Sequence, residues 1–383
     1  MRSLIKGFSI GIMAAALLLL VHLPVQTEQV EPSIREDTVE PSHRKDDTDF
    51  VNISVMLREK GSVTLKEGET YFLTDYIRLN SHNSIDATGA KIIVPVDRGV
   101  IRNDPANYKT DYSSMTDVEI KGGTWVSLNE NGYDGGTSFS FAHCQDIRLS
   151  DMNIRCTNAK GHAIELVACK NVTIDNCTII AQGQGESTCR EEMVQIDMAS
   201  PNTAPFLNET FQNGLPCRNI TVTNCTITGC RGLCAMYASD DEKNINKYHD
   251  TVIIKNNTIV GTTSEALALF NTINAEINGN RIITKSKRVT ETVSVGCKLA
   301  LLGDNSAFSK GKAVVKNNVI KGGRQGFVLK SDTASVYGSL EIKDNKLFCK
   351  QDIEKNALKI ANNSKKVKSV NKVDNSGNKF YKW

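Results

Sequence analysis

The chain has 383 residues, with 46 Lys and Arg, 43 Asp and Glu, and a formal net charge of +3. This length can bury a large core, in one repeat domain or in two ordinary domains. Acidic and basic residues are mixed along the chain without a basic stripe, which argues against a nucleic-acid-binding protein.

The first residues have the pattern of a secretory signal. Arg2 and Lys6 precede an uninterrupted apolar segment at residues 12–21. We expect residues 1–27 to be a cleaved signal peptide or an uncleaved N-terminal anchor, which places the protein outside the cytoplasm, secreted or at the cell surface. Residues 28–49 are polar and nearly lack large apolar side chains, so they are predicted to form a disordered linker. The folded domain is expected over residues 50–383.

Most of the remaining sequence repeats one short phrase, as in "NVTIDNCTI", "NITVTNCTI" and "TVIIKNNTI". The phrases align on Met152, Cys177, Cys225, Asn257, Asn280, Asn318, Asn345 and Asn378. Successive anchors are about 23 to 48 residues apart, which is typical of solenoids. Each copy alternates β-branched and polar residues, as strands do. The repeats therefore predict an all-β solenoid.

The anchor positions indicate stacked side chains. An Asn that recurs from Asn257 to Asn378 suits a turn, because its side chain tolerates the left-handed conformation and can bond to the next coil. We expect a ladder of amides. Cys177 and Cys225 occupy the same place in earlier copies, where buried free thiols are favoured over a disulfide.

A second strand recurs ahead of each phrase, as in "HAIELVAC", "EMVQIDMA" and "GFVLKSD". Alternation predicts that one set of residues points into the coil: Ile164, Leu166, Val194, Ile196, Phe327 and Leu329. The other set would form an outward polar stripe: Glu165, Gln195, Asp197, Lys330 and Asp332.

Residues 61–95, "GSVTLKEGETYFLTDYIRLNSHNSIDATGAKIIVP", resemble the first coils of the pectate-lyase-like superfamily of right-handed parallel β-helix proteins. The "KNVTIDNCTI" copies resemble later coils. The resemblance implies a single-stranded right-handed parallel β-helix from about residue 50 to the C-terminus, and a polysaccharide as its partner. It implies no single activity, because the superfamily hosts several chemistries. Solenoids of this kind tend to be monomeric, so we expect a monomer.

The longest interruption of the repeat locates the candidate site. Two loops, "AQGQGESTCR" and "SPNTAPFLNETFQNGLP", flank the strand at residues 193–197. Insertions in solenoids usually wall a binding groove. Glycoside hydrolysis needs a carboxylic acid and a carboxylate, and coils about 4.8 Å apart can supply both. The candidate catalytic residues are Glu165, Glu192, Asp197, Asp240 and Asp241. The candidate substrate-binding residues are Gln195, His162, Tyr237, His249, Arg324 and Lys330.

The motifs leave three activities open. Polygalacturonase-like glycosidases carry Asn-Thr-Asp, Asp-Asp, Gly-His-Gly and Arg-Ile-Lys on successive coils. Gln195-Ile196-Asp197 and Asp240-Asp241 resemble the first two, but the later two are missing, which disfavours homogalacturonan as the substrate. The favoured prediction is a glycoside hydrolase of another polysaccharide, which needs no cofactor. A polysaccharide lyase would use a basic residue such as Lys330 and Ca²⁺. A non-catalytic glycan-binding adhesin is the third reading.

Overall fold

The computed structural model describes residues 37–94, 99–127, 137–156, 161–181, 192–236, 247–286, 294–303, 306–332, 335–350, 352–362 and 368–383. The chain divides into two units, Met1–Arg35 and Glu36–Trp383. The predicted signal or anchor segment lies in the first unit, outside the described residues. None of the helices in the described ranges is long and apolar enough to span a bilayer.

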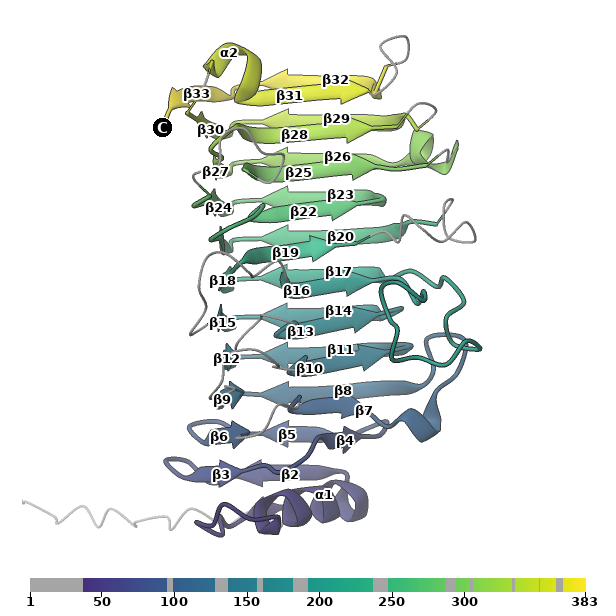
Figure 1. The fold of residues 1–383 in the computed structure, drawn as a ribbon, viewed down its shortest axis with the longest axis vertical. Helices are drawn as coiled ribbons and strands as arrows, with labels where there is room; N and C mark the ends of the chain where they lie inside the picture. Colours follow the sequence, from purple (N-terminus) through teal and green to yellow (C-terminus); the bar gives the residue numbers. More distant parts are fainter. Residues whose placement is uncertain are drawn as a thin grey trace, which may run out of the picture. The chain divides into compact units, whose positions relative to one another are not determined.

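The second unit is a stack of coils, and most coils contribute one strand to each of three parallel sheets (Figure 1). The 12-stranded sheet contains β1 (Thr38–Val39), β2 (Ser62–Leu65), β5 (Ser84–Asp86), β8 (Met115–Lys121), β11 (Cys144–Ser150), β14 (Lys170–Asp175), β17 (Arg218–Thr223), β20 (His249–Lys255), β23 (Thr272–Asn278), β26 (Lys312–Lys316), β29 (Tyr337–Lys343) and β32 (Val370–Ser376). The 10-stranded sheet contains β4 (Ile77–Leu79), β7 (Ile101–Asn103), β10 (Phe139–Ala142), β13 (Ile164–Val167), β16 (Glu192–Asp197), β19 (Arg231–Ala235), β22 (Leu267–Phe270), β25 (Val295–Leu301), β28 (Gln325–Ser331) and β31 (Leu358–Asn362). The 11-stranded sheet contains β3 (Thr70–Phe72), β6 (Lys91–Val94), β9 (Thr124–Ser127), β12 (Asn153–Cys156), β15 (Thr178–Ala181), β18 (Thr226–Gly229), β21 (Thr258–Gly261), β24 (Arg281–Thr284), β27 (Val319–Lys321), β30 (Lys346–Cys349) and β33 (Lys379–Lys382). The predicted parallel β-helix is confirmed.

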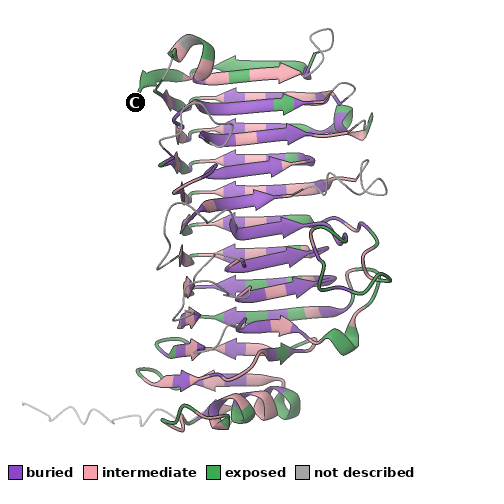
Figure 2. Cartoon of the chain, in the orientation of Figure 1, coloured by how far each residue is buried: buried purple, intermediate pink, exposed green. Residues whose placement is uncertain are grey.

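Strand alternation places the core inside the coils, as Figure 2 shows by the buried stretches along the strands. The predicted inward residues Ile164, Leu166, Val194 and Ile196 are all fully buried. Adjacent coils align these residues in register, since Ile164 pairs with Val194 and Leu166 with Ile196. The inward half of the alternation prediction is therefore confirmed.

The predicted asparagine ladder is present inside the corner between the 12- and 11-stranded sheets. The Asn257 side-chain amide donates to Asn280 Oδ1 at 3.0 Å, and the Asn257 backbone N–H donates to the same oxygen at 2.9 Å. The same pattern continues along the chain to Asn378. One detail of the prediction is wrong: the left-handed residue is the one before the ladder, such as Asn256 with a φ of 55°. That residue turns the corner, so the ladder side chain can point inward.

Cysteines take the ladder position in earlier coils, as predicted. Cys177 and Cys225 are buried and free. The Cys225 backbone N–H donates to Asn257 Oδ1 at 2.8 Å, and the Cys177 N–H donates to Cys225 Sγ at 3.4 Å. The thiol thus replaces the amide oxygen as the acceptor for the preceding coil. Cys230, elsewhere in the chain, is disulfide-bonded.

The first coil is covered by a helix that the sequence analysis missed. Helix α1 (Thr48–Lys60) buries Ile53 and Leu57 against the core. Residues 37–49 were predicted to be disordered, but β1 pairs with β2, and buried Asp49 accepts hydrogen bonds from the backbone of Ser42 and Phe72. These contacts order the segment, so the prediction of a linker is wrong for residues 37–49.

The remaining helices are short. Among the described residues, the 3-10 helices are η1 (Pro105–Asn107) and η3 (Ser306–Lys310), and α2 (Ile353–Asn356) lies against the last coil (Figure 1). That coil is less covered than the first, because Val373 is 44% exposed and Phe380 45% exposed. The two ends of the described solenoid therefore differ in how they shield their inward residues.

Candidate functional site

Four polar side chains gather on the outward face of the 10-stranded sheet, on strands β13 and β16. Register sets Glu165 beside Gln195, and Val167 beside Asp197. Glu192 begins β16. Although the alternation directs Glu165, Gln195 and Asp197 away from the core, these residues are only 2–6% exposed. The structure therefore brings three predicted acids together in a shielded place.

The loop after β16 shields one side of this place. Ala199, Ala204 and Leu207 form a small apolar cluster with Val167, the strand neighbour of Asp197. Phe211 of the same loop packs edge-on against Tyr108, with ring centroids 5.5 Å apart. Burial raises the pKa of Tyr108 above its usual range. This loop, the second of the two that flank the predicted site, thus covers the strand end next to Asp197.

Asp197 has the electrostatic surroundings of a proton donor. Burial raises the pKa of Asp197 well above its usual range, and the negative charge of Glu165 raises it further. A hydrogen bond of 2.5 Å from Gln195 Nε2 to Asp197 Oδ1 opposes both effects. The remaining oxygen, Gln195 Oε1, is buried and accepts no hydrogen bond from any described residue. Asp197 is therefore a carboxylic acid that can hold a proton at a pH where ordinary carboxyl groups are ionised.

Glu165 is held by its neighbour on the preceding coil. Ser140 Oγ donates to Glu165 Oε2 at 2.9 Å, and Ser140 pairs in register with Arg102 on β7. The Arg102 guanidinium lies 4.2 Å from the ring centre of Tyr76. Arg102 Nε is buried and donates to no described residue. The face thus carries a cation two coils before the Glu165 carboxylate.

Glu192 differs from Glu165 and Asp197 because it is the first member of a series of ion pairs. Arg231 Nη1 contacts Glu192 Oε1, and Arg231 Nη2 lies 3.1 Å from Glu265 Oε2. Glu265 is also paired with Lys298, whose Nζ lies 3.2 Å from Oε1. The predicted binding residue His162 lies beside the first member of this series of ion pairs, with its Nδ1 3.0 Å from the Glu192 backbone carbonyl oxygen. Charges of opposite sign therefore alternate across the sheet from β16 to β25, which favours a positioning role for Glu192.

His249 is not in the groove, contrary to the prediction. Its side chain is fully buried in the column of Cys144, Cys169 and Cys217, one coil further on. The Cys217 backbone N–H donates to His249 Nδ1 at 3.1 Å, and His249 Nε2 lies 3.0 Å from the Met236 carbonyl oxygen. Both ring nitrogens are occupied inside the solenoid, so this histidine is structural. The remaining candidates Tyr237, Asp240 and Asp241 lie outside the described residues.

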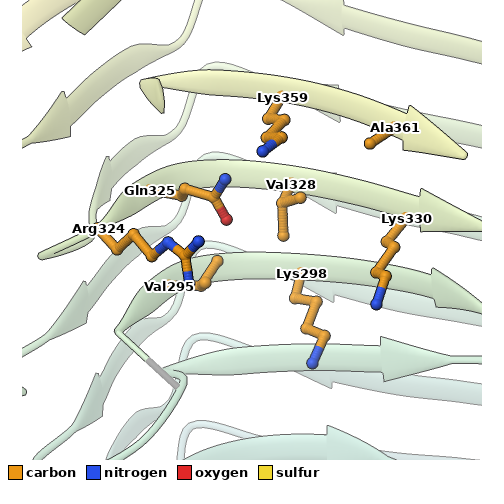
Figure 3. Close-up of a pocket in the computed structure, with 8 residues that line it drawn as sticks. All are labelled: Val295, Lys298, Arg324, Gln325, Val328, Lys330, Lys359 and Ala361. Atoms are coloured by element: carbon orange, nitrogen blue, oxygen red, sulfur yellow. The ribbon is translucent and has the colours of Figure 1, made fainter. Parts of the chain in front are cut away.

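Arg324 and Lys330 lie together but away from Asp197. They line a hollow of about 290 Å³ on the same face, between β25, β28 and β31 (Figure 3). The lining residues are Val295, Lys298, Arg324, Gln325, Val328, Lys330, Lys359 and Ala361. Strand β25 is the third strand after β16 in the sheet order, a separation of about 14 Å at the usual strand spacing. The face therefore has an acidic part and a basic part.

Four charged residues of this face were not among the site residues predicted from the sequence: Arg231, Glu265, Lys298 and Lys359. Arg231 and Glu265 stand just before the apolar part of their strands, as Glu192 does. Aligning the strand starts would have found them. Lys298 and Lys359 occupy outward positions by the same alternation that selected Lys330. Among the described residues, no group of three or more His, Cys, Asp or Glu side chains is arranged to hold a metal ion.

Comparisons with known proteins agree on the fold. No family model and no curated protein matches the chain in sequence. Two structures of PfbA, a surface adhesin of Streptococcus pneumoniae, match with TM-scores of 0.55 and 0.53 at 15% and 16% identity. Both cover 90% of this chain, and the matches cover 97% and 91% of PfbA. The A-module of the mannuronan C-5 epimerase AlgE6 from Azotobacter vinelandii matches with a TM-score of 0.49 at 11% identity, covering 86% of this chain and 88% of that one.

Identities this low bear on the fold and not on the activity. The coils, the three parallel sheets and the matched structures agree with the resemblance of residues 61–95. The chain has the right-handed parallel β-helix fold of the pectate-lyase-like proteins.

Proposed function

We propose that the protein is an extracytoplasmic glycoside hydrolase that cleaves a polysaccharide on the outward face of the 10-stranded sheet. Asp197 is the general acid and Glu165 is the second carboxylate. The observation that carries this proposal is the buried Asp197, whose pKa is raised beside another carboxylate. Glycoside hydrolysis requires a carboxyl group that keeps its proton and, close to it, a second carboxyl group that acts as base or nucleophile.

The spacing of the two strands suits the reaction. Asp197 is two residues beyond the register partner of Glu165, so their Cα atoms are about 8 Å apart at usual strand spacing and rise. Two carboxyl groups this far apart at the backbone can flank one glycosidic bond. Asp197 gives its proton to the leaving oxygen as the bond to the anomeric carbon breaks. Glu165 takes a proton from the attacking water, or attacks that carbon and is released by water afterwards.

Glycan binding is supported by the character of the face. Gln195 Oε1 is a buried acceptor without a partner among the described residues, and a sugar hydroxyl that enters the shielded place beside Asp197 would give it a hydrogen bond. The likeness to the adhesin PfbA supports a second candidate, a surface protein that binds its ligand without cleaving it. The two candidates differ in what Asp197 does, and mutation can therefore separate them.

The test measures reducing ends released from a panel of neutral and acidic polysaccharides. We expect Asp197→Asn and Glu165→Gln each to lower kcat by about 10²- to 10⁴-fold, the usual contribution of a positioned acid or base. Glu119→Gln removes a carboxylate from β8 of the 12-stranded sheet, where it pairs with Arg148, and should leave kcat unchanged. Because the Asp197 pKa is raised, cleavage should persist at a pH where an ordinary carboxyl group has lost its proton.

Two results would contradict the proposal. Cleavage that survives both substitutions would show that the active site is elsewhere. Binding of a glycan by the wild type without any cleavage across the panel would favour the adhesin. NMR of the first product would identify its anomer, and hence whether Glu165 activates water or attacks the sugar.

A further inference from the structure

The basic hollow on β25, β28 and β31 is built by an alternation of long and short side chains. Register stacks Lys298, Val328 and Lys359 in one outward column, and Ala300, Lys330 and Ala361 in the next. Each lysine is thus beside short apolar residues on the neighbouring strands. The short side chains form the floor and the lysines form the walls (Figure 3).

The charges of the walls are unequal. Lys298 is paired with Glu265, and its Nζ lies 4.7 Å from the ring centre of Phe270, so its charge is already compensated. Figure 3 shows Lys359 reaching over Val328 and Lys330 reaching toward β25. Within the described part of the chain, neither Lys330 nor Lys359 has an ion-pair partner. Arg324 brings a further guanidinium to the rim. Lys330 and Lys359 therefore bring positive charge to the hollow that no carboxylate of the described residues neutralises.

The floor suits a sugar ring. Val295, Val328 and Ala361 present an apolar surface, and the Gln325 amide stands beside it. Sugar rings have an apolar face and polar edges, so a floor of this kind with polar groups at its rim can hold one ring in a fixed orientation. A volume of about 290 Å³ is at the lower end of the range for small-ligand sites. One monosaccharide unit is the size of ligand that this hollow can take.

We propose that this hollow binds an acidic sugar of the glycan chain, with its carboxylate or sulfate group between Lys330 and Lys359. The inference rests on the proposed function, since it names the substrate class of that face. Lys330 on β28 and Lys359 on β31 are four and five strand spacings from β16, about 19 and 24 Å at the usual spacing, so the hollow binds a sugar several units away from the cleaved bond. It would select an anionic polymer and fix its register on the sheet.

The experiment measures binding without cleavage, in the Asp197→Asn background. The probes are a hexamer of uronic acid, a sulfated oligosaccharide and a neutral oligosaccharide of the same length. We expect Lys330→Met and Lys359→Met each to weaken binding of an acidic hexamer about tenfold, since methionine keeps the stem and removes the charge. Affinity should fall with added salt, and the double variant should show a smaller salt dependence. The control, Lys91→Met with Lys346→Met, removes two exposed lysines from β6 and β30 of the 11-stranded sheet.

Each outcome decides between the two proposals. Weaker binding of the uronate or of the sulfated probe in the lysine variants, with binding unchanged in the control, supports the hollow and tells which anion it takes. If an acidic hexamer binds equally to all variants, the hollow does not bind the acidic sugar, and the proposed hydrolase activity is unaffected. Equal affinity for the neutral probe also overturns the proposed role of the hollow. Failure of every probe to bind, with a folded protein, counts against the proposed function itself.

Discussion

The buried carboxylate of Glu265 should stabilise the fold in a strongly pH-dependent way. Its residue is 2% exposed, and its oxygens lie 3.1 Å from Arg231, 3.2 Å from Lys298 and 2.7 Å from the Ser264 hydroxyl. Burial alone would raise the pKa of Glu265, but the two cations overcome burial and lower it to about 2. A carboxyl group whose pKa falls from 4.5 to about 2 on folding contributes about 3 kcal/mol to the free energy of unfolding.

The sign of the pH dependence follows from the lowered pKa. Above pH 4.5 the group is ionised in both states, and the full contribution is present. As the pH falls toward 2, the unfolded chain takes up the proton first, and the contribution is lost. Glu265→Gln should therefore lower the free energy of unfolding by about 3 kcal/mol at pH 7, and the difference from wild type should shrink steadily between pH 4.5 and 2.5.

Urea unfolding followed by circular dichroism at pH 7, 4.5 and 2.5 measures this difference. The control is Glu276→Gln, which breaks a partly exposed pair with Lys255 at 3.1 Å on the 12-stranded sheet. Such a pair contributes about 1 kcal/mol or less. The predicted stabilisation is refuted if Glu265→Gln lowers the free energy of unfolding no more than the control does at pH 7, or by the same amount at every pH. Either result would show that Arg231 and Lys298 do not stabilise the ionised Glu265 carboxylate.

Three more outcomes are expected. Asp197→Asn should raise the melting temperature at neutral pH, because the raised pKa of Asp197 means that folding favours its protonated form. Below about pH 4 the carboxyl group is protonated in both states, so the variant should lose this advantage. An equal rise in melting temperature at pH 3.5 and 7.5 would argue against burial as the cause of the raised pKa. Asn280→Ala should lower the free energy of unfolding in urea by about 3 kcal/mol, since Asn257 loses its hydrogen-bond acceptor and the Ile254 carbonyl loses its donor. A decrease below about 1 kcal/mol would show that the neighbouring residues of the ladder rearrange to restore these hydrogen bonds. Cys225→Asn should keep or raise the melting temperature by extending the ladder toward Asn257, and a lower melting temperature would show that the amide does not fit there.

The fold could be predicted because its information is local and repeated. The strand alternation fixed the inward residues, and the anchor positions located the ladder from Asn257 to Asn378. The helix α1 could not be found this way, because it lies outside the repeat and its first residues follow a polar segment. Its order depends on Asp49 binding the backbone of Ser42 and Phe72, which are contacts that no sequence pattern displays.

The candidate site was predicted in part. Glu165 and Asp197 come together because register is set by the same repeat that defines the strands. Whether an outward residue is shielded depends on the packing of loops, and so does the raised pKa of Asp197. His249 misled the sequence analysis because the column it joins is filled by cysteines in earlier coils, so its interior place has no repeated signal.

The cysteine columns give the protein its own internal reporters. Cys144, Cys177, Cys225 and Cys297 are buried and free on different coils, and burial raises the pKa of Cys156 to about 12. A thiol reagent reaches such groups only when neighbouring coils separate, and reacts with the thiolate. Labelling rates followed by mass spectrometry would therefore rank the coils by how often each one opens, without any engineered probe.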